Sequence, residues 1–486
     1  MENTSGLPWT ISAAAGAVLL AFGLMAYLPE AAQADPNDYT FTRLATVPGP
    51  VPGQATETFD LDFEPHAINA AGNVAFAADL MKADTDIGEG VFASSSGRLL
   101  QIMTPGDPAP GDKNLFFLSS SETGVLGMTP LNNFGDGAFV YILNTWDPKT
   151  QPIGLNAGLY RFSRTIPKPS AVVVPGVTPA PTGHPGDTFA GVYFNTALND
   201  RSDLVFAGIA PYPQLKNKPG FKGLGVGLFM ADNRNNIVKI VAPGDPAPGG
   251  KVFDDAWQGW PNNLGTIGFE GHVAGDKCID IGSPLVCGSS LYKRSAGGEI
   301  ESIAHQGDPA PGGGTYRQAF GAVVNDQDDL VFTGDLTPAP KALETLGLFV
   351  NSQGKTSSVV RPGDAMPGGG HFVTASQFPY AVRLNNSKQI SFIVRLDTDV
   401  NGDGVGDTGL YVLSEGKLQL VARTGTPIPG GGTIAHINNP LYVSVDGAAA
   451  AFFDEPAIND LGQIFFEATL ADQKTGVLLV ATPRAQ

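Results

Sequence analysis

The sequence predicts an all-β protein, a seven-bladed β-propeller with four antiparallel strands in each blade. Three observations lead to this prediction. Two short motifs alternate along nearly the whole chain, which indicates stacked repeats rather than several unrelated domains. Gly and Pro account for 62 and 39 of the 486 residues, a composition that favours short strands and turns. The first and last fragments of the chain together complete one repeat.

The first motif reads apolar-Asn-x-x-Gly-x-x-small-Phe, and its copies are 60 to 74 residues apart. The Asn side chain can bond the backbone two residues on and so opens a tight turn. The Gly can adopt positive φ, which fits a hairpin to the strand twist. Apolar and polar residues then alternate, as in a half-buried strand with the Phe in the core. The copies begin at Asn69, Asn132, Asn199, Asn262, Asn325, Asn385 and Asn459, and Ser202, Asp328 and Lys388 replace the Gly in three of them.

The second motif closes each unit. It runs from a Gly-apolar-aromatic segment, through a hairpin that ends on Gly, to a Pro-Gly-Asp-Pro-Ala-Pro-Gly turn. Proline cannot donate to a strand ladder, so this turn ends the last strand and leads to the next unit. We expect the Asp of this turn to cap its own turn rather than to build a ring of carboxylates. The residues concerned are Asp107, Asp245, Asp308 and Asp364.

The two chain ends predict how the ring closes. The segment from Tyr39 resembles only the last strand and turn of a unit, and the C-terminal unit stops after the strand that begins at Gly476. We therefore expect Thr42 to Val47 to pair with Val477 to Thr482, in a three-plus-one closure. A four-stranded unit must stack on neighbours, and a propeller leaves only short edges exposed. The predicted organisation is a signal peptide or anchor at residues 1–34 and one propeller domain at residues 35–486.

The repeats from Asn69 to Phe466 resemble a family of exported bacterial tandem-repeat proteins that is named for an NxxGxxAF motif. Some of these relatives carry alternative C-terminal sorting anchors, which the polar C-terminus of this chain does not resemble. The resemblance implies export and a surface location. It implies no particular activity.

Charge and the N-terminal segment bear on location. The formal net charge is −18, and an acidic surface repels phosphate backbones, which argues against nucleic-acid binding. Ile11 to Leu28 carries no charge, and Ala32-Gln33-Ala34 offers a cleavage site. These features predict a secreted, extracellular or cell-surface protein. The alternative is a membrane-tethered ectodomain, because no Lys or Arg precedes Arg43 and the apolar run is long enough for an uncleaved anchor.

The two cysteines, Cys278 and Cys287, are nine residues apart and flanked by Gly and Pro. An isolated pair in an exported chain predicts a disulfide that staples a hairpin. The alternative, a zinc half-site, would need further ligands, and the sequence has no other cysteine and no histidine pair nearby.

An acidic loop predicts one structural calcium site. The stretch from Asp399 to Asp407 reads D-x-N-x-D-G-x-x-D, which brings alternate oxygen side chains to one side of a coiled loop, as Ca²⁺ requires. Leu410 stands where an EF-hand has Glu, so the loop instead resembles those inserted in integrin-type propellers. The alternative is a solvated acidic turn. The predicted ligands are Asp397, Asp399, Asn401, Asp403, the carbonyl of Val405, and Asp407.

Aromatic residues follow the Pro-Gly-Asp turns. If these segments are loops, their rings lie on one face of the ring and can stack on a sugar or peptide. The alternative is that they fill gaps between blades. The candidate ligand face consists of Trp257, Trp260, Tyr316, Phe378 and Tyr380.

No catalytic constellation is present in the sequence. The six histidines lack metal-site spacing, and there is no HExxH, G-x-S-x-G or phosphate-loop motif. The sequence therefore favours a non-enzymatic, calcium-stabilised module that binds a glycan, a peptide or a cell-surface polymer, or that builds the surface. The alternative is a hydrolase or lyase acting on extracellular polysaccharide, with a site at the channel mouth.

Overall fold

The computed structural model describes residues 38–484, with gaps at 55, 96, 120–123, 148, 152–153, 164, 166–167, 216–222, 279–286, 288–289, 338–345, 376–381, 438–455 and 473. The predicted export segment, residues 1–34, lies outside the described residues. In the part that is described, no helix is both long enough and apolar enough to cross a membrane.

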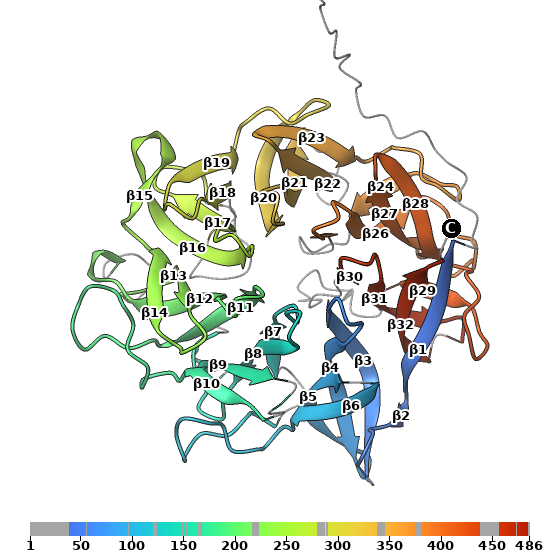
Figure 1. Ribbon diagram of the computed structural model, residues 1–486, viewed down its shortest axis with the longest axis horizontal. Helices are drawn as coiled ribbons and strands as arrows, with labels where there is room; N and C mark the ends of the chain where they lie inside the picture. Colours follow the sequence, from blue (N-terminus) through green and yellow to red (C-terminus); the bar gives the residue numbers. More distant parts are fainter. Residues whose placement is uncertain are drawn as a thin grey trace, which may run out of the picture.

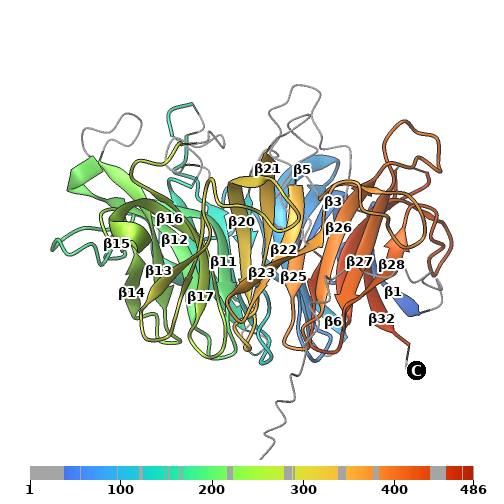
Figure 2. The same ribbon diagram turned by 90° about the horizontal axis from the view of Figure 1, so that it is seen from above.

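The described strands hydrogen-bond into seven antiparallel sheets. These sheets follow one another in chain order around a central axis (Figure 1). Seen from the edge of the ring, their strands run between its two faces (Figure 2). This arrangement is a β-propeller, as the repeats predict.

The first four sheets comprise the following strands. The first contains β2 (Gly49–Pro50), β3 (Glu57–Ile68), β4 (Val74–Lys82), β5 (Thr85–Ser95) and β6 (Arg98–Met103). The second contains β7 (Val125–Met128), β8 (Asp136–Ile142), β9 (Ala157–Ser163) and β10 (Ser170–Val173). The third contains β11 (Gly191–Leu198), β12 (Leu204–Pro211), β13 (Leu224–Ala231) and β14 (Ile237–Val241). The fourth contains β15 (Pro246–Ala247), β16 (Lys251–Pro261), β17 (Ile267–Val273), β18 (Ser290–Arg294) and β19 (Ile300–Ala304).

The remaining sheets complete the ring. The fifth contains β20 (Thr315–Val324), β21 (Leu330–Thr337), β22 (Leu346–Ser352) and β23 (Lys355–Val360). The sixth contains β24 (Phe372–Ala375), β25 (Val382–Leu384), β26 (Ile390–Leu396), β27 (Thr408–Ser414) and β28 (Lys417–Arg423). The last contains β29 (Ile434–Ile437), β30 (Ala457–Ile458), β31 (Ile464–Leu470), β32 (Gly476–Pro483) and β1 (Tyr39–Val47). Two short 3₁₀ turns, η1 (Pro213–Leu215) and η2 (Pro248–Gly250), lie between strands.

Six propeller blades are detected in the ring, not the predicted seven, although the strands form seven sheets. The sheet that holds both chain ends takes its outer strand, β1, from the N-terminus, and the described parts of its inner strand are β29 and β30. The structure therefore establishes a propeller, and the blade number is a separate proposal.

The predicted pairing of the chain ends is confirmed. Strand β1 pairs with β32 in antiparallel register, from Tyr39 opposite Pro483 to Val47 opposite Gly476. In Figure 1 the blue N-terminal strand lies beside the dark red C-terminal sheet. The ring is thus held shut by a main-chain ladder between the two ends of the described chain.

The turn motif behaves as predicted and also joins neighbouring repeats. In the fourth sheet, Asn262 Oδ1 accepts hydrogen bonds from the N–H groups of Leu264 and Thr266, at 3.0 and 2.8 Å. Asn262 Nδ2 donates to the carbonyl oxygen of Asn325 in the next repeat, at 2.9 Å. The Gly position has positive φ in every copy, including +62° at Ser202. One side chain therefore closes its own turn and binds the following repeat.

These cross-repeat hydrogen bonds run around the ring. Six of the seven motif asparagines donate to the carbonyl of the next motif asparagine, and the last of them, Asn459, donates to Asn69 at 2.8 Å. Asn132 differs and donates to Ser202 Oγ at 3.2 Å. All seven asparagines are buried, so each bond is protected from water. We call the surface formed by these turns the Asn face, and the opposite surface the loop face.

The hydrophobic core lies between the sheets. The Phe of the first motif is buried in every copy, at 0 or 1% exposure. In six copies it packs on an aromatic ring of the next strand in the same sheet, as Phe76 does on Phe92 at 5.3 Å between ring centroids, and Phe466 instead packs on Phe41 of β1. The recurrent Phe is therefore a core residue, as the sequence predicts.

Replacing Asn459 by Ala tests the ring of asparagines. The change removes the hydrogen bond that joins the last repeat to Asn69 and the oxygen that accepts two N–H groups of the turn, so we expect the free energy of unfolding to fall by about 2–4 kcal/mol. Asp472→Ala is the matched control, because Asp472 caps only its own turn, and about 1 kcal/mol is expected there. Urea denaturation measures both values, and equal losses would contradict the cross-repeat role.

Candidate functional site

A polar pocket of ≈ 140 Å³ lies where the turns of the Asn face converge, and we call it the axial pocket. Every repeat contributes its motif asparagine and the residue that follows it. Trp260 and Pro261 add apolar surface. The polar lining and its neighbours are Asn69, Ala70, Asn132, Asn133, Asn199, Asp200, Asn262, Asn263, Asn325, Asp326, Asn385, Asn386, Asn459 and Asp460.

The residues that follow the motif asparagines form a second hydrogen-bonded ring. In chain order they alternate between amide and carboxylate: Asn133, Asp200, Asn263, Asp326, Asn386 and Asp460, with Ala70 as the seventh member. In each of six steps the backbone N–H of one member donates to Oδ1 of the next, at 2.7–3.1 Å. Ala70 has no oxygen to offer, so the alternation ends there.

Amide side chains bridge the carboxylates of this second ring. Asn263 Nδ2 donates to Oδ2 of both Asp200 and Asp326, at 3.1 and 2.9 Å. Two neighbouring carboxylates therefore lie within two hydrogen-bond lengths of each other. Asn386 Nδ2 donates to Asp460 Oδ2 at 3.3 Å. The alternating order in the sequence was a readable signal for this ring, which the motif analysis missed.

A buried cationic group lies next to the pocket. Arg383, on β25, is 7% exposed, and its guanidinium carbon is 4.7 Å from the centroid of the Trp260 ring. Burial lowers the pKa of Arg383 to about 9, which leaves it protonated at neutral pH. Burial, and then the charge of Arg383, lowers the pKa of His66 to about 3. Glu64 Oε2 lies 3.4 Å from His66 Nε2, but burial and Arg383 dominate the shift.

The predicted calcium loop connects β26 and β27 on the loop face. The Asp399 carboxylate accepts the N–H groups of Gly402, Asp403 and Gly404, at 2.8, 3.2 and 3.0 Å. These bonds coil the loop around that carboxylate. From the next sheet, His436 Nε2 lies 2.7 Å from Asp403 Oδ2.

Other predicted ligands of this loop are engaged elsewhere. Asp407 is fully buried and accepts from Val400 N–H, Thr398 Oγ1 and Arg423. Asp397 contacts His371 through both carboxylate oxygens, and those bonds lower its pKa. Asn401 Nδ2 donates to Asp403 at 2.9 Å. The predicted calcium ligands that lie together in one coil are therefore Asp399, Asn401, Asp403 and Val405.

The predicted aromatic face is not an exposed surface. Trp257 and Tyr316 lie on the inner strands β16 and β20 and are 7% and 3% exposed. The sequence analysis placed them in loops, whereas an inner strand begins directly after each Pro-Gly-Asp turn. Trp260 lines the axial pocket, and Phe378 and Tyr380 lie outside the described residues. The Asp residues of the turns cap their own turns, as Asp364 does for Arg361 N–H at 2.8 Å.

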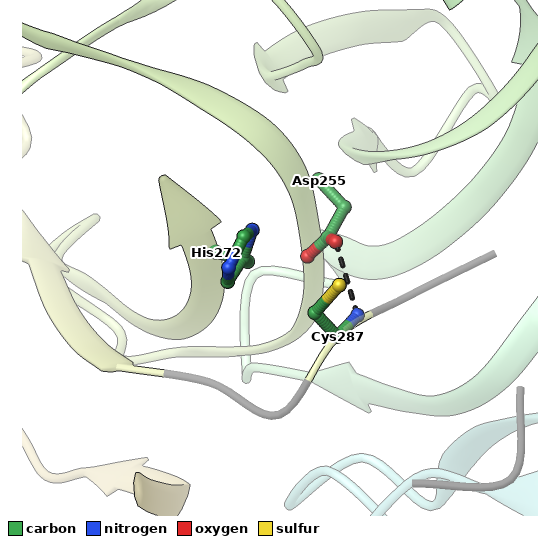
Figure 3. A group of neighbouring side chains, drawn as sticks. All are labelled: Asp255, His272 and Cys287. Atoms are coloured by element: carbon green, nitrogen blue, oxygen red, sulfur yellow. Dashed lines mark hydrogen bonds between the residues drawn. The ribbon is translucent and has the colours of Figure 1, made fainter. Parts of the chain in front are cut away.

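The predicted disulfide is present between Cys278 and Cys287. Its buried half lies beside Asp255 and His272, which face each other across β16 and β17 (Figure 3). One ligand atom from each of Asp255, His272 and Cys287 lies within 4.8 Å of the others. Among the described residues this is the one such group of three His, Cys, Asp or Glu side chains. Sequence spacing did not reveal it.

The pKa of His66 predicts a pH-dependent stability. In the folded protein the imidazole stays neutral down to about pH 3, whereas in the unfolded chain it takes up a proton below its ordinary value of 6.5. Stability is therefore greatest above that ordinary value and falls as the pH decreases, by up to about 1.4 kcal/mol per pH unit. His66→Gln should flatten this slope between about pH 6 and pH 4 in urea denaturation. The exposed His184→Gln serves as control, and an unchanged slope in His66→Gln would refute the assignment.

Comparison with known proteins gives distant structural similarities. No curated protein sequence matches the chain. A puromycin-hydrolyzing peptidase from Mycobacterium tuberculosis has a TM-score of 0.43 at 10% identity, over 84% of this chain and 49% of that one, so this chain spans about half of its length. A gluconolactonase from Xanthomonas campestris has a TM-score of 0.35 at 11% identity, over 91% and 98%. An α-L-arabinofuranosidase from Fusarium graminearum has a TM-score of 0.35 at 10% identity, over 80% and 97%. At these values the similarities carry no inference about activity.

A protein family covers nearly the whole chain. Residues 30–323 and 262–479 each match the family described as "Family of unknown function (DUF7453)". The two matches overlap, as expected when one repeat pattern occurs many times. This chain belongs to the DUF7453 family.

Proposed function

We propose that the seven sheets are the seven blades of one ring, and that the protein is an exported binding module whose ligand site is the axial pocket. The observation that carries this proposal is the convergence of side chains from every repeat on one polar pocket beside Trp260. The disulfide supports export, because such bonds persist in oxidising compartments. The NxxGxxAF pattern supports kinship with exported repeat proteins.

The chemistry of the pocket suits a hydroxyl-rich ligand such as the terminal residue of a glycan. Among the described residues, Asp326 and Asp460 each use two of about four acceptor positions, and Asn133 and Asn386 each use one amide hydrogen. Sugar hydroxyls both donate and accept, so they match a lining that offers both. Trp260 adds the apolar contact that such ligands use. The pocket volume suits one sugar ring or its edge.

An enzyme acting on polysaccharide is the second candidate. The specific observation in its favour is the close pair Asp200 and Asp326, bridged by one amide at the pocket. Glycosidases use two carboxyl groups about 5–10 Å apart. Each carboxylate already accepts a backbone N–H, from Asn133 at Asp200 and from Asn263 at Asp326, which favours binding over proton transfer, so we place this candidate second.

Glycan binding tests the first proposal. We expect Asp326→Asn and Asp460→Asn each to weaken binding of an oligosaccharide found on a glycan array at least about tenfold, equivalent to about 1.4 kcal/mol. Titration calorimetry measures the affinity, and thermal melting shows whether each variant is folded. Asp472→Asn, which changes an exposed turn residue, should bind like the parent.

Three results would count against this proposal. Absence of any glycan ligand would refute it, and so would binding that both folded variants retain. Cleavage of the bound oligosaccharide, seen as new chain ends by mass spectrometry and lost in Asp326→Asn, would establish the enzyme instead.

We also propose that the loop Asp397–Asp407 binds one structural calcium ion. The support is the coil around Asp399 and Asp403, whose carboxylates accept N–H groups of Gly402, Gly404 and Val405, together with the oxygen-rich donor set of this loop, which Ca²⁺ prefers. An ion would order this β26–β27 connection next to His436. Asp407, held by Arg423, would act by positioning the loop rather than by ligation.

Calcium removal provides the test. A ligand that binds only the folded state stabilises by about 2.7 kcal/mol at a hundredfold excess over its dissociation constant, so we expect chelation to lower the melting temperature. Asp399→Ala should melt at the lower temperature with and without calcium. Asp472→Ala should keep the calcium response. A melting temperature that calcium does not change would refute the site.

A further inference from the structure

The group around the buried half of the disulfide carries an inference independent of the axial pocket. Asp255 and His272 are 1% and 6% exposed and occupy opposite positions on β16 and β17. Cys287 is 7% exposed, and its N–H donates to Asp255 Oδ2 at 3.2 Å (Figure 3). Nitrogen, oxygen and sulfur ligand atoms therefore lie together in a protected place.

A strand irregularity places a further carboxylate beside His272. Successive side chains of a regular strand point to opposite faces. The register between β16 and β17 shifts between Phe253 and Asp255, and such a bulge redirects a side chain. As a result, Asp254 Oδ2 also lies 3.6 Å from His272 Nδ1. His272 therefore has the Asp254 carboxylate 3.6 Å away and the Asp255 carboxylate within 4.8 Å.

In the oxidised chain this group lacks one metal ligand. A metal ion binds the thiolate form of cysteine, and the sulfur of Cys287 is bonded to Cys278. Reduction changes the donor set from nitrogen and oxygen to nitrogen, oxygen and thiolate. That mixed set suits Zn²⁺, which takes His, Asp and Cys in tetrahedral geometry, and does not suit Ca²⁺ or Mg²⁺.

The exposure of the two cysteines decides which of them an external thiol attacks during thiol–disulfide exchange. Cys278 is exposed and Cys287 is buried. An external thiolate can therefore attack the sulfur of Cys278, breaking the disulfide and releasing the Cys287 thiolate inside the group. A second external thiol then resolves the mixed disulfide, so two small thiols are oxidised to one disulfide and two cysteine thiols form. If Cys287 is protonated, metal binding displaces that proton.

We propose that reduction of the Cys278–Cys287 disulfide by a small thiol creates a zinc site from Cys287, His272 and Asp255, with Asp254 or water as the fourth ligand. Metal–ligand distances of about 2.0–2.3 Å bring neighbouring ligand atoms to less than about 4 Å. The present group, within 4.8 Å, therefore needs only a small contraction. Zinc binding at the fourth sheet would then depend on the redox state of the surroundings.

Cobalt(II) reports directly on this site in the full-length chain. After reduction with a phosphine, we expect one Co²⁺ per chain, with the near-ultraviolet charge-transfer band of a cobalt–thiolate bond, and displacement by Zn²⁺. The oxidised chain should show no such band. Cys278→Ser should show it without any reductant, because Cys287 is then free. His272→Gln should weaken zinc binding about 10–100-fold, whereas the exposed His184→Gln should leave it unchanged.

The decisive comparison is between the two cysteine variants. Cys287→Ser should lose the band and Cys278→Ser should keep it, although both lack the disulfide. If both variants keep the band, or if neither Cys278→Ser nor the reduced parent shows it, the proposal is wrong. Near-ultraviolet circular dichroism confirms that each variant is folded. If Cys287→Ser does not fold, the folded Cys278→Ser and His272→Gln variants still decide the question.

Discussion

Each repeat is joined to the next by a hydrogen bond from its motif asparagine. The oxygen of this side chain holds the turn of its own repeat, and in six of the seven copies its nitrogen donates to a main-chain carbonyl of the following repeat, as Asn262 does to Asn325. Because both ends of the amide are used in a buried place, the turn and the neighbour must form together. A local turn preference is thereby converted into a contact between repeats that are about 63 residues apart in the sequence.

The same ring creates the polar pocket. The residues directly after the asparagines have their side chains at the axis, where alternate amides and carboxylates satisfy each other, as Asn263 does between Asp200 and Asp326. Like charges are thus separated by a neutral donor. An odd number of positions cannot alternate completely, and Ala70 is the member that interrupts the pattern. The candidate ligand site therefore uses groups that also stabilise the ring.

Motifs in the sequence were sufficient to predict the fold. They did not reveal the groups of side chains that distant segments bring together. The turn chemistry, the buried Phe and the pairing of the chain ends follow from motifs that repeat along the sequence. Of the two predictions left open for the aromatic residues, packing between blades rather than an exposed ligand face fits Trp257 and Tyr316, which are buried on inner strands. The group at Asp255 and His272 depends on a strand bulge, which spacing does not reveal.

The joining of β1 to β32 also governs when the protein can finish folding. Thr40 and Thr482 are hydrogen-bonded although 442 positions separate them along the chain. Contacts between such distant segments form slowly. When the chain is made or exported with its N-terminus first, β1 emerges long before β32. The edge of β1 therefore stays unpaired until the final segment emerges. During that interval β1 is an unpaired strand, and its open edge can pair with a strand of another chain.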